Sequence, residues 1–536
     1  MQNASLVYGP SVDLYVPDLE ADPEKPPAES EPSDDPREVP LPVRTEFPQL
    51  QRRRTRIVAT LGPSSRSSDS IRALVEAGVD VFRLNFSHGS HEEHRETFRR
   101  IREVAGGDDV AVLADLCGPK IRVGRFPGGK ILLEEGTGVT VVVREGGAEG
   151  EGTTGIIPSA YDGLVRDVTP GDRILLDDGR LELQVEEVGV AEVRCRVVRG
   201  GVLRDRKGMN LPGVNVSAPS LTKPDRLDAE LALELGVDFL ALSFVRHARD
   251  VEELRRVVGT EDDRPGIIAK IEKPEALEAI EGILELSDGI MVARGDLGVE
   301  LPPEEVPLAQ SELVRKARAA GVPVIVATQM LESMVDHPRP TRAEVSDVAG
   351  AVHSGADAVM LSAETAAGAH PLEAVRVMDR VARKVEGYLW EQGAFGAWAG
   401  SASGPAEFGV EEAIARATAL LSRDLMVRAI VVREEVRHGE SVRRVSAGRP
   451  QAPVLLSSPR GGVRRTARLL WGVVPWSEDG RGGAEEGSGG GERAGEAARA
   501  AARAAGLAST GDHILEVGGF HSDRAVAAPA VRVVQV

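Results

Sequence analysis

The chain has 536 residues, of which 42% are hydrophobic and 28% charged, and its formal net charge is −19. This acidic balance argues against general nucleic-acid binding, which needs a basic face, but still permits an anionic ligand in a local cationic pocket. The sequence contains no run of 18 apolar residues and no secretory pattern, and Cys117 and Cys195 form no CxxC pair, so we expect a cytoplasmic protein without a membrane span, disulfide scaffold or zinc site.

The first 50 residues are rich in Pro, Asp and Glu, as in "DPEKPPAESEPSDDPREVP". Such a segment cannot bury enough apolar surface to order itself, so it is predicted to be a disordered tail. It is also too acidic for an organelle transit peptide. The arginine run at 52–54 is interpreted as a solvated start of the folded chain, with a contact to a partner as the alternative.

From residue 55 onward, short β-rich runs alternate with helical patterns such as "SDSIRALVEAG" and "QSELVRKARAAG". Strands that alternate with helices indicate parallel βαβ units, and eight strands close a (β/α)8 barrel. We therefore predict an α/β fold with a TIM barrel over residues 51–117 and 220–390. The runs are "RIVATLG", "DVFRLNF", "VAVLADL", "DFLALSFV", "GIIAKIE", "GIMVARG", "VPVIVATQ" and "AVMLSAE".

One gap in this rhythm is too long for a single helix, because about 120 residues separate the third run from the fourth. The gap holds short strand patterns with Gly and Asp-Asp-Gly turns, including "RILLDDGRLELQVEEV" and "AEVRCRVVRGGVL". We predict a small all-β domain over 118–219, inserted at a βα loop. Because those loops open on the active face of a barrel, the insert is placed to act as a lid.

After the barrel, residues 391–405 have the Gly, Ala and Ser composition of a linker. Residues 406–536 show a second α/β pattern, with a helix from 410, strands at "AIVVR", "APVLLSS" and "DHILEVGG", and a helix from 461. This C-terminal domain is expected to serve regulation and oligomerisation. Residues 477–496 are predicted to be a solvated loop, followed by an Ala/Arg-rich helix.

The stretch "GIIAKIEKPEAL" (266–277) places a lysine and a glutamate at the end of an apolar strand. Strand side chains alternate, so Lys270 and Glu272 point the same way, toward the mouth of the predicted barrel. Polar residues also end the other strands, and (β/α)8 enzymes place their chemistry at this face. These polar residues at the strand ends are Arg83, Asn85, Ser87, Asp115, Ser243, Asp296, Thr328, Gln329, Ser362 and Glu364.

The residue types at this mouth suggest a reaction class. Glu272 and Asp296, without histidine or thiolate, form a hard-cation set suited to Mg²⁺ or Mn²⁺. Arg83 and Lys270 would supply positive charge for an anionic group such as phosphate. A divalent ion, a lysine and an arginine at one place are the groups expected for phosphoryl transfer.

Eight ordered motifs carry a family resemblance: "RLNFSHG", "GPKIR", "GMNLPG", "AKIEKPE", "MVARGDLGVELP", "VATQMLESM", "PTRAEVSDVA" and "MLSAETAAGAHPLEAV". With these motifs the chain resembles the pyruvate kinase family from about residue 55 to 390, and more weakly to its end. The resemblance implies a barrel with a β lid and a C-terminal α/β domain. It also implies formation of pyruvate and ATP from phosphoenolpyruvate and ADP, the last step of glycolysis, by a homotetramer.

The resemblance further implies roles for individual residues. Lys270 resembles the lysine that stabilises the transferring phosphoryl group and the enolate, and Arg83 the arginine that holds the substrate phosphate. Glu272 and Asp296 resemble the divalent-metal ligands, and the backbone of Gly295 and Asp296 the site of the substrate carboxylate. Thr328 resembles the residue beside the carbon that is protonated, with Ser362 and Glu364 in the associated proton path. The residues that resemble the nucleotide site are Asn85, Phe86, Ser87, His88, Arg122 and Lys207.

The family's K⁺ site resembles the set Asn85, Ser87, Asp115 and the Leu116 carbonyl. Members that need K⁺ carry Thr-Lys after the aspartate and a glutamate where this chain has Lys120. Here Leu116 and Lys120 follow the K⁺-independent pattern, although Cys117 departs from it. A fixed ammonium can replace the charge of K⁺, so we predict that K⁺ is not required.

In members of the resembled family that fructose 1,6-bisphosphate activates, a Ser/Thr/Gly-rich loop after a strand of the C-terminal domain holds the phosphate. The matching stretch here is "VVREEVRHGES", with Glu434 and Glu435 where an anion would sit, and the last loop, "GGFHSDR", is short. Adjacent carboxylates repel a bisphosphate, so we predict no activation by it.

Two other functions fit part of the pattern. A metal-dependent lyase acting on phosphoenolpyruvate or pyruvate would use the same mouth, but it would not need Arg122, Lys207 and the lid. A catalytically silent binding protein would not need an intact mouth cluster, and a Schiff-base aldolase would explain Lys270 alone. His91 and His94 in "SHEEH" lack zinc-protease spacing, and Ser90 with Glu93 fits a helix capping box better.

Overall fold

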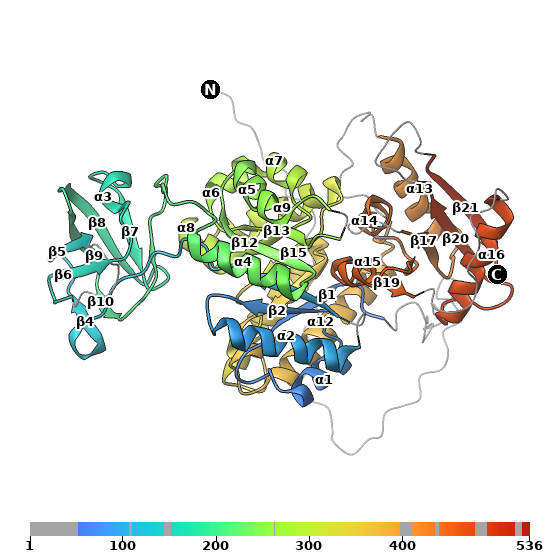
Figure 1. Ribbon diagram of the computed structural model, residues 1–536, viewed down its shortest axis with the longest axis horizontal. Coiled ribbons are helices and arrows are strands. Elements are labelled where there is room, and N and C mark those ends of the chain that lie inside the picture. The colour runs from blue at the N-terminus through green and yellow to red at the C-terminus, as the bar shows by residue number, and fades with distance from the viewer. Residues whose placement is uncertain are drawn as a thin grey trace, which may run out of the picture. The chain divides into compact units, whose positions relative to one another are not determined.

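The computed structural model describes residues 52–106, 110–143, 152–261, 263–396, 409–434, 439–477, 490–519 and 528–536 (Figure 1). The predicted tail at 1–50, most of the linker at 391–405 and the first part of the predicted loop at 477–496 lie outside these residues. Within the described part of the chain, no helix combines the length and apolar character needed to cross a membrane.

Eight parallel strands close into a barrel in the order β1-β16-β15-β14-β13-β12-β3-β2. Each strand coincides with one of the eight predicted runs, which confirms the predicted fold class. The strands are β1 (Arg56–Thr60), β2 (Val81–Asn85), β3 (Ala111–Asp115), β12 (Phe239–Val245), β13 (Gly266–Ile271), β14 (Gly289–Ala293), β15 (Val324–Ala327) and β16 (Ala358–Leu361).

Helices follow the barrel strands and start and stop at local signals. Ser90 and Glu93 form the predicted capping box at the start of α2, and Gly321, at φ 70°, ends α9 in the left-handed conformation. The helices of the barrel region are α1 (Ser68–Glu76), α2 (His91–Ala105), α4 (Lys223–Leu235), α5 (Ala248–Val258), α6 (Pro274–Glu278), α7 (Ile280–Leu286), α8 (Arg294–Glu300), α9 (Val306–Ala320), α10 (Arg342–Ser354), α11 (Ala363–Ala366) and α12 (Pro371–Glu391).

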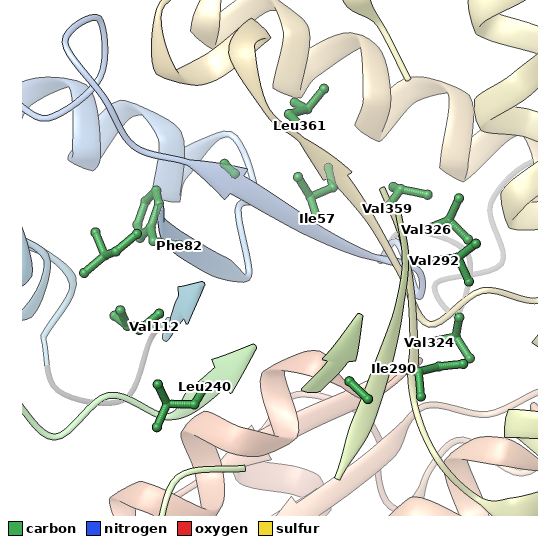
Figure 2. Packing of buried hydrophobic residues seen from close by; sticks show 14 of the residues in the cluster. Ile57, Phe82, Val112, Leu240, Ile290, Val292, Val324, Val326, Val359 and Leu361 are labelled. Atoms are coloured by element: carbon green, nitrogen blue, oxygen red, sulfur yellow. The ribbon is translucent and has the colours of Figure 1, made fainter. Parts of the chain in front are cut away.

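The barrel has two apolar layers because its strands are buried on both faces. Outward side chains such as Ile57, Phe82 and Leu240 belong to one buried cluster with side chains from the surrounding helices (Figure 2). Inward side chains such as Val58 and Ile268 fill the barrel interior. The interior is therefore a packed core, and the chemistry is confined to the strand ends.

Four buried aspartates brace the opposite end of the barrel. They immediately precede the strands β2, β12, β14 and β16. Each accepts a hydrogen bond, at 2.9 or 3.0 Å, from a backbone N–H of the preceding barrel strand. Each carboxylate also pairs with at least one arginine. These bonds hold the strands in register at the end away from the mouth. The four are Asp80, Asp238, Asp288 and Asp357.

The segment between β3 and α4 forms the predicted β-rich insert, with its own apolar core. Six strands form one sheet in the order β11-β7-β8-β9-β5-β6, and β4 pairs with β10. In β8 buried and more exposed side chains alternate, as expected for a half-buried strand. The elements are β4 (Lys130–Leu133), β5 (Gly138–Val143), β6 (Ile156–Ser159), α3 (Leu164–Asp167), β7 (Arg173–Leu176), β8 (Leu181–Val188), β9 (Glu192–Arg199), β10 (Gly201–Arg204) and β11 (Met209–Asn210).

The C-terminal domain contains a five-stranded sheet in the order β19-β18-β17-β20-β21, with β21 antiparallel to β20. Two of its strands, β19 and β21, were not among the predicted elements. The elements are α13 (Val410–Asp424), β17 (Ile430–Arg433), α14 (Glu440–Ala447), β18 (Val454–Ser457), α15 (Gly461–Thr466), β19 (Val473–Trp476), α16 (Gly490–Ala504), β20 (His513–Gly518) and β21 (Ala530–Gln535).

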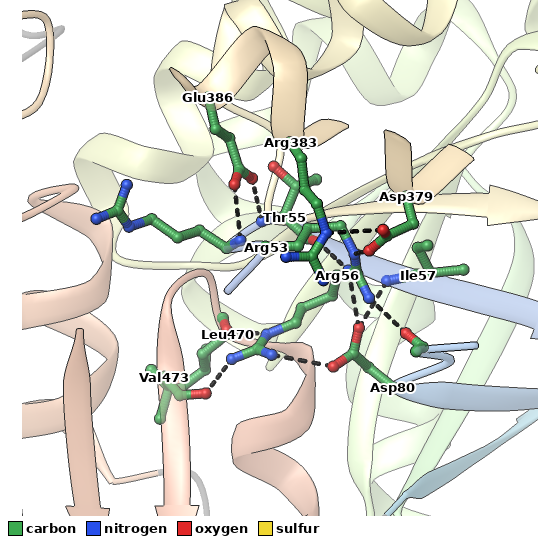
Figure 3. A network of polar contacts seen from close by, with 12 residues as sticks. Arg53, Thr55, Arg56, Ile57, Asp80, Asp379, Arg383, Glu386, Leu470 and Val473 are labelled. Atoms are coloured by element: carbon green, nitrogen blue, oxygen red, sulfur yellow. Dashed lines mark hydrogen bonds and ion pairs between the residues drawn. The ribbon is translucent and has the colours of Figure 1, made fainter. Parts of the chain in front are cut away.

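Two predictions about charged or polar segments were wrong. The predicted loop at 477–496 is too long, because α16 already begins at Gly490 and includes its last seven residues. The arginine run at 52–54 is solvated only at Arg52, which is exposed: Arg53 pairs with Asp80 and Asp379 (Figure 3), and Arg54 is only 3% exposed. A charge run looks solvated in sequence, but here its partners come from distant parts of the chain.

Candidate active site

Lys270 occupies the centre of the barrel mouth. Lys270 is the penultimate residue of β13, and its ammonium lies between two carboxylates. Nζ is 3.2 Å from Asp115 and 3.0 Å from Glu272. Nζ also donates a hydrogen bond to the Ser243 hydroxyl at 2.7 Å. Burial alone would lower the pKa of Lys270, but the two carboxylates more than offset this and raise it. The lysine is thus a fixed cation, held ready to meet an anion.

Arg83 lies beside this lysine, on the neighbouring part of the barrel. Its Nε donates to the second oxygen of Asp115 at 2.6 Å, and its Nη1 donates to the Thr60 hydroxyl at 3.0 Å. Burial would raise the pKa of Asp115, but Lys270 and Arg83 outweigh it and lower the pKa. One buried carboxylate therefore holds two cations at fixed positions near each other.

Glu272 and Asp296 supply the carboxylates expected to hold a divalent ion. Glu272 is only 1% exposed and accepts the backbone N–H of Phe244 at 2.7 Å. Burial, with the charge of Asp296 adding to it, raises the pKa of Glu272. A divalent cation between the two carboxylates would offset this repulsion, and both are hard oxygen donors, so the residues fit Mg²⁺ or Mn²⁺.

The protein alone does not complete a metal site. Among the described residues, no three His, Cys, Asp or Glu side chains gather in a way that could hold a metal ion. A pair of carboxylates leaves most positions of an octahedral ion open to water and to oxygen atoms of a substrate. This incomplete donor set is typical of ions that are bound together with a phosphorylated substrate.

Thr328 and Gly295 meet at the start of α8. The backbone N–H of Gly295 donates to the Thr328 hydroxyl at 2.7 Å. Thr328 and Gln329 have positive φ angles of 69° and 55°, which are strained for residues with a side chain. The buried side chain of Arg294 supports them by donating to the Thr328 carbonyl at 2.7 Å. Sequence analysis missed Arg294, and its only signal was its place before Gly295 in "MVARGDLGVELP".

Ser362 and Glu364 are connected through the backbone. Glu364 is 1% exposed and accepts the N–H of Ser362 at 2.7 Å and the N–H of Leu331 at 3.1 Å. The carboxylate thereby ties the end of β16 to the segment that follows Thr328. These hydrogen bonds to Glu364 stabilise the backbone at the barrel mouth.

The predicted nucleotide residues are more dispersed than the central cluster. Phe86 is buried and stacks on His94, with ring centroids 4.2 Å apart, whereas His88 is exposed. In the insert, the Lys207 ammonium pairs with Asp177 at 2.8 Å. The Arg122 guanidinium donates to the backbone carbonyl of Arg206 at 3.2 Å. Both cations are therefore held by groups of the insert itself.

Two members of the predicted K⁺ set, Asp115 and the Leu116 carbonyl, belong to the same network. The Leu116 carbonyl accepts a hydrogen bond from the Ser243 hydroxyl at 2.7 Å, and Asn85 accepts the N–H of Ser87 at 3.2 Å. Lys120 extends toward Asp296, with Nζ 3.8 Å from its carboxylate. Ser243 therefore connects the Leu116 carbonyl to Lys270, a link that the sequence pattern did not reveal.

The insert contacts the barrel next to these residues. A small cavity of about 40 Å³ is lined by Lys120 and Asp296 together with Met209 and other apolar residues of the insert. Nearby, Asn210 of β11 donates to Glu300 of α8 at 3.2 Å, and Glu300 pairs with buried Lys273 at 2.6 Å. The insert is thereby anchored at the helix that carries Asp296.

Comparisons with known proteins agree with this geometry. The family descriptions "Pyruvate kinase, barrel domain" and "Pyruvate kinase, alpha/beta domain" match residues 52–375 and 412–534. A pyruvate kinase of Agrobacterium vitis is 44% identical over 486 residues, covering 90% of this chain and 97% of that protein. Pyruvate kinase 2 of Synechocystis sp. is 44% identical over 79% of this chain and 70% of its own length. The crystal structure of a pyruvate kinase from Cryptosporidium parvum has a TM-score of 0.81 and 35% identity, covering 91% of this chain and 97% of that one. The chain therefore belongs to the pyruvate kinase family.

Proposed function

We propose that the barrel mouth carries out the reaction of this family, the transfer of the phosphoryl group of phosphoenolpyruvate to ADP, giving pyruvate and ATP. The observation that carries the proposal is the pair of buried cations, Lys270 and Arg83, which contact opposite oxygens of Asp115 at 3.2 and 2.6 Å. Phosphoryl transfer depends mainly on positioned charge, and this pair supplies it without reorganisation during the reaction.

Arg83 and Lys270 have separate parts in this proposal. A guanidinium has five N–H donors, and Asp115 and Thr60 engage two of those on Arg83, so others can hold the substrate phosphate. Lys270 would lie beside the transferring group and the oxygen that it leaves. Its ammonium stays protonated at neutral pH because the neighbouring carboxylates raise its pKa. Lys270 would therefore stabilise the transferring phosphoryl group by its positive charge.

Glu272 and Asp296 would hold Mg²⁺ or Mn²⁺. When bound, such an ion neutralises charge on the phosphoryl and enolate oxygens. The two carboxylates contribute position, since Glu272 is fixed by the Phe244 N–H and Asp296 is carried on α8. Burial of Glu272 also favours replacing its proton by a metal ion over leaving a bare charge.

The far side of the mouth would complete pyruvate formation. The backbone of Gly295 and Asp296 is proposed to receive the substrate carboxylate, for which the Gly295 N–H would leave the Thr328 hydroxyl. Thr328 would then stand beside the carbon to be protonated. Ser362 and Glu364 are proposed to belong to the proton path. Asn85, Phe86, Ser87 and His88 with Arg122 and Lys207 would hold ADP and ATP, the last two brought near by movement of the insert.

A coupled assay that converts pyruvate to lactate tests the proposed function. Purified protein with phosphoenolpyruvate, ADP and Mg²⁺ is expected to oxidise NADH through lactate dehydrogenase, and omission of ADP is expected to stop it. A lyase would act without ADP, and a silent binding protein would give no signal. Gel filtration and fractionation would test our further proposals of a homotetramer in the cytoplasm.

The position of Lys120 predicts activity without K⁺. A fixed ammonium on Lys120 can supply the positive charge that K⁺ brings to family members that require it. We expect near-full turnover in K⁺-free buffer with a bulky organic counter-ion, and little change on adding KCl at constant ionic strength. Lys120→Glu is expected to create a K⁺ requirement, whereas Lys130→Glu, at an exposed lysine of β4, is not. Strong K⁺ activation of the unmodified chain would contradict the prediction.

Fructose 1,6-bisphosphate is predicted not to activate this protein. Glu434 follows β17, and its side chain lies against Gly439, so a carboxylate occupies the start of the loop. Glu435, the rest of that loop to 438 and most of the last loop lie outside the described residues. The half-saturating phosphoenolpyruvate concentration is expected to stay the same with millimolar bisphosphate, and a large decrease would show that the loop binds it.

A further inference from the structure

The strand β12 ends in an irregular segment beside the strand that carries Lys270. Its pairing with β13 shifts register between Leu242 and Val245, so β12 has one extra residue there. Such a bulge turns side chains and backbone groups away from the regular ladder. The displaced residues are Ser243 and Phe244, and Phe244 has a φ of 55°, which is strained for a residue with a side chain. The backbone is therefore held in an unusual conformation next to the barrel mouth.

The hydroxyl of Ser243 is an oriented hydrogen-bond acceptor. It donates to the Leu116 carbonyl at 2.7 Å and accepts from Lys270 Nζ, also at 2.7 Å. A carbonyl can only accept and an ammonium can only donate, so the single proton of the hydroxyl must point to Leu116 and its lone pairs to Lys270. Ser243 is only 1% exposed, so water has little access to either bond. The direction of this acceptor is thus fixed by the protein.

Three acceptors at three strand ends surround the ammonium of Lys270. Its three N–H donors have partners in Asp115 at 3.2 Å, Glu272 at 3.0 Å and Ser243 at 2.7 Å. The two carboxylates attract the ammonium by charge, and this attraction depends little on angle. The hydrogen bond to the neutral hydroxyl is the shortest of the three, and its strength depends steeply on angle. Ser243 therefore contributes direction to the lysine more than charge.

The bulge also contacts both connections between the barrel and the insert. Leu116, the acceptor for Ser243, lies on the connection that leaves β3. Two residues later Gly118, at a φ of 68°, packs so closely that a Cβ on it would lie 2.8 Å from the Cβ of Ser243. On the returning connection, the Ser220 hydroxyl donates to the Phe244 carbonyl at 2.8 Å. The segment that directs Lys270 is therefore attached to the insert on both sides.

We propose that Ser243 is a positioning residue: its oxygen orients the ammonium of Lys270 toward the transferring phosphoryl group, and its bond to Leu116 ties that orientation to the insert. The inference rests on the proposed function and adds a residue that acts through Lys270. Displacement of a reacting group by about 1 Å can cost about 10²-fold in rate, so a small change in direction matters. The insert, which carries Arg122 and Lys207, is thereby connected to the lysine that acts on the phosphate.

Steady-state kinetics of Ser243→Ala test the proposal. The variant removes the oriented acceptor and leaves the rest of the bulge in place. Turnover is expected to fall about tenfold or more. The KM values for phosphoenolpyruvate and ADP are expected to change by less than about threefold, because the lost interaction is made in the transition state. If the hydroxyl only stabilised the bulge, the variant would instead unfold at a lower temperature and keep its turnover.

Two further variants separate the hydrogen bond from packing and from burial. Ser243→Cys keeps a side chain of similar shape with a much weaker donor and acceptor, so its turnover is expected to fall as that of Ser243→Ala does. Because it fills the same space, it remains a test if the alanine variant does not fold. Ser287→Ala is the matched control, since Ser287 is buried and donates to the Ile283 carbonyl at 2.7 Å. It lies before β14, at the end of the barrel away from the mouth, and turnover is expected to stay unchanged.

Full turnover by Ser243→Ala or by Ser243→Cys would overturn the proposal. A change confined to the KM values or to thermal stability would overturn it as well. These outcomes differ from a failure of the proposed function, in which the unmodified chain would form no pyruvate from phosphoenolpyruvate and ADP. That result would remove both proposals, whereas an active chain with fully active Ser243 variants would remove only the role of Ser243.

Discussion

Lys270→Met is expected to reduce turnover by about 10²–10³-fold or more, because it removes a charge aimed at the transferring phosphoryl group. Methionine has a similar length and fills the same space, so the barrel is expected to remain folded. Asp115 keeps its bond to Arg83 in the variant, which limits the damage to the network. Steady-state turnover with saturating substrates gives the result, and circular dichroism with thermal unfolding verifies the fold.

Lys273→Met provides a matched control, since Lys273 is also buried in an ion pair three residues further along, with Glu300. If loss of any buried ammonium near the mouth disabled the enzyme, both variants would lose activity equally. We expect Lys273→Met to retain at least a hundred times the turnover of Lys270→Met. Near-wild-type turnover by Lys270→Met would exclude the proposed role of this lysine.

Glu272→Gln is expected to raise the half-saturating Mg²⁺ concentration by about 10²-fold, because a neutral amide replaces a charged metal ligand. The amide keeps the size of the side chain and can still accept the N–H of Phe244. The loss should therefore appear in the Mg²⁺ titration more than in the fold. Turnover measured against Mg²⁺, at saturating substrate and constant ionic strength, gives this value.

Glu278→Gln makes the same chemical change at an exposed position of α6, six residues further along. It is expected to leave the Mg²⁺ titration unchanged. A Glu272→Gln variant with the same Mg²⁺ titration as the unmodified chain would show that Glu272 is not a metal ligand. With Mn²⁺ in place of Mg²⁺, Glu272→Gln should again have a higher half-saturating metal concentration than Glu278→Gln, since Mn²⁺ prefers the same oxygen donors.

Strand alternation accounts for much of what could be predicted. Lys270 and Glu272 share one side of their strand because side chains alternate, and the parallel barrel brings Asp115 and Arg83 to the same end. Periodicity therefore predicts both the fold and the convergence of these groups. It does not show which partner each group selects, and the bonds from Ser243 to Leu116 and Lys270 depend on packing across strands that are far apart in sequence.

Arg53 and Arg54 show what local sequence patterns cannot predict. Three consecutive charges after an acidic segment are typical of a solvated surface, and nothing local indicates burial. Their partners Asp379 and Glu386 lie more than 300 residues later in the chain. The strands β19 and β21 were missed although they are as long as β18 and β20, with which they pair. In β19, Pro475 is a residue that weakens a strand prediction.

The aspartates at the end of the barrel away from the mouth limit how this chain could be recombined in evolution. Asp357 holds the N–H of Val324 within the barrel, but its other partners, Arg449 and the N–H of Trp471, belong to the C-terminal domain. Stripping one partner from a buried ion pair costs about 3–5 kcal/mol, a large part of the roughly 5–15 kcal/mol that stabilises a typical protein. A barrel inherited without its C-terminal domain, or with an unrelated one, would carry that penalty. Asp357 therefore couples the stability of the barrel to that of the C-terminal domain.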